Sequence, residues 1–580
     1  MSIIRLWTLT ISVLGFKVLA QYTDDNVTLP QFLTNNPLPQ GFPWGTKTAN
    51  NTNMFRVIRS FDFTVKRETK APDGYQRPVM IINGQFPGPL IEANWGDTIQ
   101  VTVHNEIDHP PEGVALHWHG LLQKTSQWMD GVPGIQQCPI PPGGSFTYTF
   151  SADLYGTSWY HSHYSAQYAD GIFGPMIIHG PNTLPYDIDK GPILLTDYYH
   201  APYLDIVEGV VGTNRSATIP TSDNNLINGK NNFDCSSLPS GNKTPCKSNA
   251  GIPNFRFSPG KVHRLRLINA GAEGVQKFTI DGHNMTVIAN DFVDIKPYET
   301  QVVTLGIGQR TDILVTGLPD GKGAYLMRSS IAACSSANNP NATAIVYYQH
   351  DAISQPVKTT PWLAWVNSVK NICVNDDLNK TVPWYPIQPD SPTVTETINI
   401  KFGQNNTGHW LWFMNNSSFR ADYNAPVLLL SNLGNNSYPD DPEWNVYDFY
   451  SNSSIRIILN NPAPVAHPMH LHGHNFFVLN VGTGAWDDST IINPTNPQRR
   501  DVQILPGAGY LVLQFNADNP GVWPLHCHIS WHVSGGLYVS VLERPDDIAK
   551  LQIPSIMAQT CRDWAIFTNG TVIDQIDSGL

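Results

Sequence analysis

Short runs in which apolar and polar residues alternate recur along the chain from Phe55 onward. Alternation with a period of two places successive side chains on opposite faces of a β-strand, so each run predicts a strand with one buried face. The clearest runs are 98–104, 145–150, 262–268, 455–459 and 510–515. Gly and Pro turns punctuate them, as at 141–144 and 506–507. The pattern predicts an all-β fold of β-sandwich or Greek-key barrel domains.

A pair of His-x-His motifs occurs in two distant parts of the chain and indicates an internal repeat. The N-terminal part contains His117/His119 and then His161/His163, and the C-terminal part contains His470/His472 and then His526/His528. The segment between them keeps a similar turn, 307–312, but contains only a lone His283 where a pair is expected. We therefore predict three consecutive domains, of which the first and third bind metal and the second is a spacer.

The predicted boundaries follow changes in composition. The first residues are apolar after Arg5 and read as a signal peptide, and the next segment is rich in Asn, Thr and Pro. The predicted segments are a signal peptide (1–20), an N-terminal arm or pro-segment (21–54), domain one (55–185), domain two (186–352), a Pro- and Trp-rich linker (353–390) and domain three (391–580).

Composition points to a secreted protein with small-molecule chemistry. The net charge is −12 and no basic cluster occurs, which argues against nucleic acid as a partner. No segment after the first twenty residues reaches the length of a membrane span, so we expect no membrane attachment. Thirteen Asn-x-Ser/Thr triplets, including Asn284 and Asn452, agree with an extracellular glycoprotein. We expect a monomer.

Seven cysteines are present, and Cys527 stands apart because histidines flank it on both sides. The other six can form three disulfides in an oxidising compartment. Fifteen pairings are possible for six cysteines, and the sequence pattern does not choose among them.

The most specific feature is the tripeptide His526-Cys527-His528. On an extended backbone the two histidines point to one face and Cys527 to the other. One tripeptide can then serve two metal sites, one with a thiolate ligand and one with imidazole ligands. Four His-x-His motifs supply eight imidazoles, which suit copper, zinc, iron or nickel. We interpret the pattern as a multicopper redox centre in which this tripeptide covalently connects the two sites.

Two simpler interpretations compete. A single His-x-His pair can occur by chance on a surface strand, but four pairs placed symmetrically in two repeats argue against chance. A structural zinc site also uses His and Cys, but it needs only four ligands in a compact cluster. His467 and His532 flank the motifs, and two imidazoles with one thiolate in a trigonal array form a blue copper site. His474 follows His472 at the same spacing, and we assign it a supporting role behind the ligands.

With these motifs the chain resembles the ascomycete-type fungal laccases within the multicopper oxidases. The resemblance extends from Phe55 to Leu580 and rests on the motifs 117–122, 128–133, 137–140, 161–163, 467–474 and 526–532. It implies three cupredoxin-like domains and four copper ions. It also implies a laccase, which takes single electrons from phenolic or aromatic substrates and reduces O2 to water.

The resemblance also implies a ligand for each copper. Type 1 copper is held by His467, Cys527 and His532, and its axial position falls on Leu537, which cannot coordinate. Type 2 copper takes His117 and His470. One type 3 copper takes His119, His161 and His528, and the other takes His163, His472 and His526. The three-copper cluster is thus divided between domains one and three, and it forms only if they dock.

Candidate proton-transfer residues also follow from the resemblance. Asp130 matches the family's carboxylate near the cluster, although an Asp before Gly can equally be a simple turn residue. Ser530 stands where some relatives carry an acid. The chain ends in 577–580 with a sequence that resembles the processed tail of ascomycete laccases, and we hypothesise that this tail enters the cluster channel and that Asp577 supplies protons. The acid that would accept a phenol proton falls near Asn249, so none is assigned.

The resemblance further suggests disulfides Cys138–Cys561 and Cys334–Cys373, which leaves Cys235–Cys246. Two other functions stay open. A ferroxidase-like metal oxidase would use the same copper set but would need carboxylates around type 1 copper. A non-catalytic copper-binding glycoprotein would not need a Cys between two cluster histidines. Lignin-derived phenols, pigment precursors and toxins are equally compatible substrates.

Overall fold

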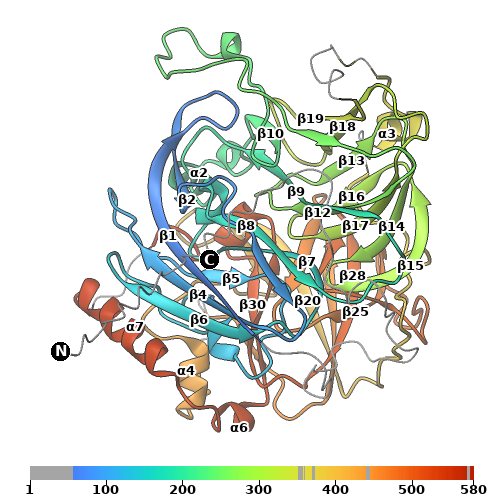
Figure 1. The fold of residues 1–580 in the computed structure, drawn as a ribbon. Helices are drawn as coiled ribbons and strands as arrows, with labels where there is room; N and C mark the ends of the chain where they lie inside the picture. The colour runs from blue at the N-terminus through green and yellow to red at the C-terminus, as the bar shows by residue number, and fades with distance from the viewer. Residues whose placement is uncertain (1–56, 350–356, 358, 369–371, 439–443, 571–574) are drawn as a thin grey trace, which may run out of the picture.

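Strands dominate the computed structural model, which describes residues 57–349, 357, 359–368, 372–438, 444–570 and 575–580. The predicted signal peptide and N-terminal arm, 1–54, therefore lie outside the described residues. The five alternating runs are confirmed as the strands β4 (Thr98–Asn105), β6 (Ser145–Ser151), β12 (Val262–Asn269), β23 (Ser454–Asn461) and β28 (Gly509–Asn516). The strands form three bodies, each of two sheets, that follow one another along the chain (Figure 1).

The first body pairs the sheet β2-β1-β4-β6 with the sheet β3-β8-β7-β5. Its further strands are β1 (Ile58–Lys70), β2 (Arg77–Ile82), β3 (Ile91–Asn94), β5 (Leu116–Trp118), β7 (Gly156–Ser162) and β8 (Phe173–His179). The second body pairs β10-β9-β12-β17-β14-β15 with β11-β19-β18-β13-β16. Its further strands are β9 (Ile188–Tyr198), β10 (Asn224–Ile227), β11 (Asn254–Arg256), β13 (Gln276–Ile280), β14 (Met285–Asn290), β15 (Val293–Thr300), β16 (Val303–Leu305), β17 (Arg310–Thr316), β18 (Ala324–Ile331) and β19 (Asn341–Tyr347).

The third body pairs β21-β20-β23-β28-β25-β26 with β22-β30-β29-β24-β27. Its further strands are β20 (Val394–Gln404), β21 (Trp410–Met414), β22 (Val446–Asp448), β24 (His467–Leu471), β25 (Phe476–Thr483), β26 (Gln498–Arg500), β27 (Val502–Leu505), β29 (Gly521–Cys527) and β30 (Tyr538–Glu543). The α-helices are short: α2 (Tyr203–Val210), α3 (Leu363–Ser368), α4 (Val427–Asn432), α5 (Ser530–Ser534), α6 (Pro545–Ile548) and α7 (Ser555–Phe567).

One pairing pattern recurs in all three bodies. In the first sheet of each body, one strand pairs in parallel with a second, which then pairs antiparallel with a third: β1, β4 and β6; β9, β12 and β17; β20, β23 and β28. In the second sheet, β5 and β7 occupy the places that β13 and β18 occupy in the second body and β24 and β29 in the third. The structure therefore contains three versions of one unit, as the histidine repeat suggests.

The three disulfides are Cys138–Cys561, Cys235–Cys246 and Cys334–Cys373, as the resemblance suggests. The first joins the N-terminal body to α7, a helix that the sequence analysis did not predict, and the buried Trp564 packs the same helix against the rest of the chain. Because the cross-link spans 423 residues, it restricts how far the first body and the C-terminal segment can separate in the unfolded chain.

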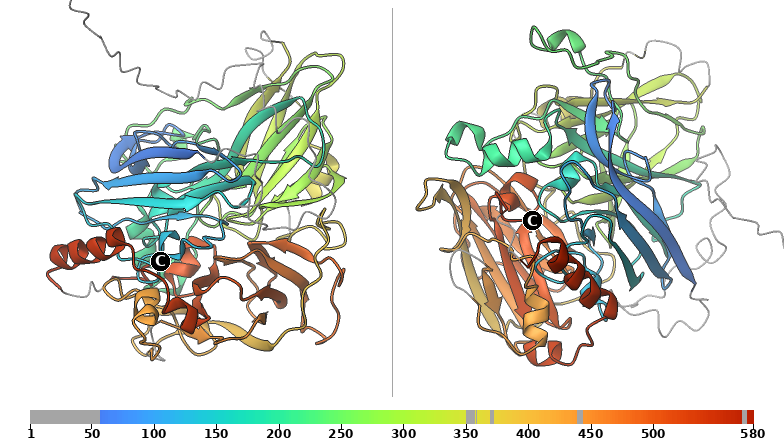
Figure 2. Two further views of the ribbon diagram at one scale, coloured as in Figure 1. Left: turned by 60° about the horizontal axis from the view of Figure 1, so that its bottom comes forward. Right: turned by 90° about the vertical axis from the view of Figure 1, so that its left-hand side faces the viewer.

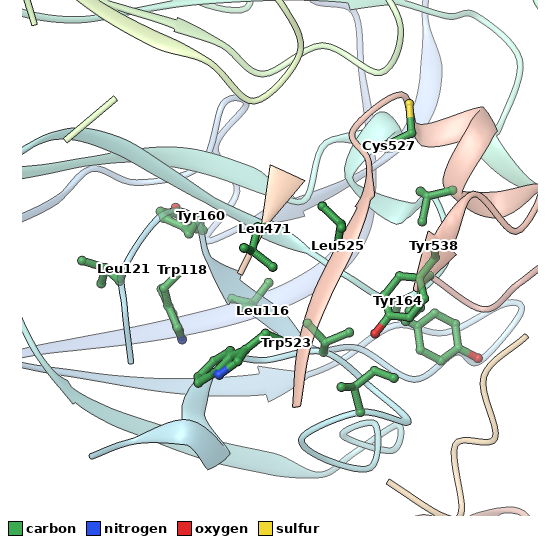
Figure 3. Close-up of a cluster of buried hydrophobic side chains, with 14 of the residues drawn as sticks. Leu116, Trp118, Leu121, Tyr160, Tyr164, Leu471, Trp523, Leu525, Cys527 and Tyr538 are labelled. Atoms are coloured by element: carbon green, nitrogen blue, oxygen red, sulfur yellow. The ribbon is translucent and has the colours of Figure 1, made fainter. Parts of the chain in front are cut away.

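A single hydrophobic core runs through the first and third bodies. Figure 3 shows part of it, with Leu116 and Trp118 of β5 near Leu471 of β24 and Leu525 of β29, and with Cys527 further along at the end of β29. These residues alternate with histidines along each strand. The shared core thus fixes the two bodies together, and the opposite face of each strand is left for the histidines. In the described residues, no helix is long and apolar enough to span a membrane.

Candidate metal centre

Strand pairing brings the His-x-His motifs of each body face to face. His117 on β5 lies directly opposite His161 on β7, and His470 on β24 lies directly opposite His526 on β29. The second histidine of each motif lies two residues further on and therefore points to the same side. The second body has Phe278 opposite Ser329 at the corresponding strand pair. Its lone His283 instead contacts the Tyr348 hydroxyl at 2.7 Å.

Eight histidines meet where the first and third bodies join, and we call them the histidine cluster. They are His117, His119, His161, His163, His470, His472, His526 and His528. The rings of His119 and His470 stack at 4.0 Å between centroids, and those of His117 and His472 at 3.9 Å, so each stack joins one body to the other. The ligand atoms of His163, His472 and His526 lie within 4.8 Å of one another, as do those of His117, His119 and His161 and those of His117, His470 and His472.

The second nitrogen of most cluster histidines is held by a protein acceptor, which fixes the nitrogen that faces inward. The Nδ1 atoms of His117 and His470 each donate to a backbone carbonyl at 2.8 Å, those of Asp130 and Asp501. His119 is reversed: its Nε2 donates to Asp501 Oδ1 at 3.1 Å, so its Nδ1 faces His528 Nε2 at 3.3 Å. The inward atoms therefore converge on the space between the rings.

The donor set fits bound copper. The Nε2 atoms of His117, His161 and His470 are buried and have no hydrogen-bond partner in the described part of the chain. Burial and neighbouring histidines hold the pKa of His119, His161, His163, His470, His472 and His528 well below the usual value, and burial lowers the pKa of His526 to about 4. The rings are therefore neutral near pH 7 and present lone pairs, as soft-to-borderline cations require.

A second set of three ligands lies on the other side of β29, and we call it the thiolate site. Cys527 Sγ lies 3.5 Å from both His467 Nδ1 and His532 Nδ1, and these two nitrogens are 3.1 Å apart. This is the trigonal His2Cys arrangement of blue copper sites. Cys527 is the free cysteine of the described residues, and burial raises the pKa of its thiol. A bound cation would supply the charge that stabilises the buried thiolate.

The thiolate site is closed on most sides. His467 and Cys527 are fully buried, whereas His532 is partly exposed, which makes its ring the accessible edge of the site. The Trp412 indole packs against both imidazoles, at 4.8 Å from His467 and 4.6 Å from His532. Leu537 is fully buried, and its backbone bonds to both Cys527 and His532. No sulfur ligand stands at this predicted axial position.

Asp130 lies at the histidine cluster, where the resemblance expects it. Its side chain is fully buried, and Oδ2 accepts a hydrogen bond from His472 Nδ1 at 2.8 Å. Its Oδ1 lies 3.2 Å from His117 Nδ1. One carboxylate therefore lies next to a histidine of each body.

Asp501 is a second carboxylate at the cluster, and sequence reasoning missed it. It bonds His119 through its side chain and His470 through its carbonyl, as described above, and Arg310 forms a bidentate pair with it at 2.6 and 2.7 Å. Burial raises the pKa of Asp501 to about 6, and the Arg310 guanidinium opposes that shift. A signal existed in the sequence, since three consecutive charged residues, Arg499, Arg500 and Asp501, directly precede the mostly apolar run 502–505.

The C-terminus lies where the first and third bodies meet (Figure 2), and the last residue is beside the cluster. Leu580 lines a small cavity with His161, His163, His526 and His528. Asp577 is buried, and its Oδ2 accepts from Ser165 Oγ at 2.6 Å, next to that cavity. Burial raises the pKa of Asp577.

Other candidate residues lie elsewhere. His474 approaches Glu543 Oε1 at 3.3 Å rather than a histidine of the cluster. Ser530 is buried at the start of α5, and Asn249 lies exposed near the Cys235–Cys246 loop. Neither supplies a carboxylate.

Comparison with known proteins agrees with this geometry. Three family models described as multicopper oxidase match residues 64–183, 189–351 and 413–547. Oxidoreductase OpS5 of Beauveria bassiana is 38% identical, and Laccase-2 of Botryotinia fuckeliana is 37% identical; in each case 90% of this chain and 89% of the relative are covered. The crystal structure of the laccase from Botrytis aclada superposes with a TM-score of 0.82 at 34% identity, covering 94% of this chain and 100% of that one.

Proposed function

Because the chain belongs to the multicopper oxidase family, we propose that it is a laccase, an oxidoreductase that takes single electrons from phenolic substrates and reduces O2 to water. The observation that carries the proposal is β29. Cys527 lies with His467 and His532 in the thiolate site, while its two neighbours in the chain belong to the histidine cluster. A storage protein has no need for a covalent link between two metal sites.

Copper is the implied cofactor, and the donor atoms support four ions distributed as the resemblance suggests. The thiolate site would hold type 1 copper, His117 and His470 type 2 copper, and the remaining six cluster histidines the type 3 pair. Bound copper would supply the one-electron redox chemistry that the side chains lack. The chain itself contributes a short covalent path from Cys527 Sγ through the backbone to His526 and His528.

Substrate would approach the exposed edge of His532. The ring is partly solvent-accessible, whereas the other two ligands of the thiolate site are buried, so outer-sphere transfer of an electron is shortest there. Trp412 provides an aromatic surface next to this edge.

Four protons are needed for each O2 reduced, and two carboxylates are candidates to deliver them. Asp130 contacts His472 directly, and Asp577 contacts the cavity through Ser165. A raised pKa keeps the Asp577 carboxyl protonated to higher pH than an ordinary aspartate, which suits a proton donor.

Removing the tail tests the role of Asp577. Deletion of 577–580 should slow O2 reduction at saturating phenol, because the proposed donor is lost. Asp577→Asn keeps the backbone contacts of the tail and should lower the rate in the same direction. A donor must be protonated, so the wild-type rate should fall as pH rises through its raised pKa, and this fall should be weaker in Asp577→Asn. Unchanged turnover in both variants would falsify the role.

Leu537→Met should lower the reduction potential of the thiolate site. The thioether sulfur of Met can donate to copper and so stabilise Cu(II) relative to Cu(I), whereas Leu537 cannot donate. We expect slower oxidation of high-potential phenols, with easily oxidised phenols much less affected. Redox titration of the blue band measures the potential. Leu537→Ile, which changes shape without adding sulfur, is the control; an equal shift in both variants would show that sulfur donation is not the cause.

Oxygen uptake with a substrate panel tests the proposed function. A methoxyphenol should support O2 consumption at a far higher kcat/KM than Fe(II). The reverse order would indicate the ferroxidase alternative, and no uptake with any reductant by copper-loaded protein would indicate the non-catalytic alternative. Turnover of lignin-derived phenols against pigment precursors in the same panel would distinguish the biological roles.

We also propose that the protein is a secreted, monomeric glycoprotein that binds neither nucleic acid nor membranes. The three disulfides support an oxidising compartment, and the acceptor triplets support glycosylation. The signal peptide and the domain boundaries given above remain predictions.

A further inference from the structure

The second body, which corresponds to the predicted spacer domain two, reaches the histidine cluster through one turn. Gly308 and Arg310 lie in the turn that precedes and opens β17. A Cβ atom on Gly308 would stand 2.7 Å from His528 Cδ2 and 3.0 Å from His119 Cε1. Only glycine allows this approach, and its φ of +82° is also one that other residues rarely adopt. The turn therefore packs directly against two predicted ligands of one type 3 copper.

Arg310 joins all three domains at a single buried guanidinium. Its two terminal nitrogens donate to Asp501 of domain three, and its Nε donates at 3.1 Å to the carbonyl of Thr157 on β7, the strand of domain one that carries His161. Arg310 and Asp501 are fully buried. A Cβ on Gly120, the residue after His119, would stand 2.5 Å from Asp501 Oδ2. The absence of a side chain at Gly120 therefore leaves the space that the Arg310–Asp501 pair occupies.

The Arg310–Asp501 pair controls the orientation of His119. Asp501 Oδ1 receives both an Arg310 hydrogen bond and the His119 Nε2 hydrogen bond. Because Arg310 fixes the carboxylate with two parallel bonds, the plane of the carboxylate is set, and with it the direction from which His119 Nε2 donates. His119 Nδ1 must then face inward, toward His528 Nε2.

We propose that Arg310 is a positioning residue for the three-copper site: from domain two it fixes Asp501, which in turn presents His119 through Nδ1. This inference rests on the proposed function, because it concerns copper at the histidine cluster. Partners behind metal-ligating histidines change metal affinity or activity by roughly 10–100-fold when they are removed. The thiolate site, which Arg310 does not touch, should be unaffected.

Three variants test the proposal in the copper-loaded full-length protein. Arg310→Lys keeps the buried charge but cannot bond both oxygens of Asp501. Arg310→Met combined with Asp501→Asn removes both charges, so no unpaired ion is left in the interior. Arg328→Lys is the matched control for Arg310→Lys, since it keeps the charge but weakens another bidentate Arg–Asp pair of domain two, with Asp281, away from the cluster.

The readouts are copper ions per chain, the blue absorbance of the thiolate site, and anaerobic reduction of that site by a phenol, besides O2 uptake. We expect the Lys variant and the double variant to keep the blue band and the anaerobic reduction rate, while cluster copper is bound at least about tenfold more weakly. The control should match the wild type. Full cluster copper in both variants would overturn the proposal, and so would parallel loss of blue and cluster copper. Failure of the proposed function would appear separately, as wild-type protein without a blue band or O2 uptake.

Discussion

Replacing Cys527 with serine is expected to abolish both the blue absorption and phenol-dependent O2 uptake. The hydroxyl is a poor ligand for Cu(II) compared with a thiolate, so the charge-transfer band disappears with the sulfur. The substitution also breaks the path that connects the thiolate site to His526 and His528. The loss should therefore exceed that expected of a residue that only orients a ligand.

Copper analysis separates this result from misfolding. Cys527→Ser should lose one copper per chain and keep those of the histidine cluster, because no cluster histidine is changed. The double variant Cys235→Ser/Cys246→Ser is the control, since it removes two sulfurs from an exposed loop far from β29. It should keep its colour and its activity. A blue Cys527→Ser protein would refute the assignment of the sulfur.

Asp130→Asn has the second largest expected effect, a reduction of roughly 10–100-fold in cluster copper affinity or turnover. The carboxylate accepts from His472 Nδ1 at 2.8 Å and orients this ligand of domain three, and its other oxygen lies 3.2 Å from His117 Nδ1, which itself donates to the Asp130 backbone carbonyl. An amide has one oxygen instead of two and carries no charge. It can still accept one hydrogen bond from His472, but it lacks the negative charge that stabilises this ligand and cannot pass a proton toward the cluster.

Asp73→Asn is the matched control for this prediction. Asp73 is also fully buried and also accepts from a histidine, His200 Nε2 at 2.9 Å, but it lies outside the histidine cluster. Its replacement should leave copper content and the ratio of cluster to blue copper unchanged. If both variants lose cluster copper equally, the effect of Asp130 is one of general stability. Metal analysis reports whether Asp130 orients the copper ligands, and O2 uptake across pH reports whether it transfers protons.

Local periodicity was enough to predict five of the strands and the faces of the histidines. Leu116 and Trp118 alternate with His117 and His119, and the same rule explains why Cys527 and His526 point apart. These properties depend on neighbours in the sequence. The helix α7 could also have been found, because Met557, Thr560 and Trp564 recur at helical spacing and are buried.

Roles that arise only from tertiary contact could not be predicted in this way. Asp501 and Arg310 are 191 residues apart in sequence, and each alone reads as an ordinary charged residue at a strand end. Only the packing of three domains makes them a buried pair behind His119. The same holds for Ser165 and Asp577, which are 412 residues apart. The resemblance suggested the tail, but it gave no partner for the carboxylate.

A crystal structure of the copper-loaded protein, with anomalous diffraction recorded at the copper edge, tests the central claim most directly. We expect one copper bonded to Cys527 Sγ, His467 and His532, and three further coppers among the eight cluster histidines, with His526 and His528 bonded to different ions of that group. A single metal ion shared by Cys527, His526 and His528 would contradict the claim that β29 separates and connects two copper sites.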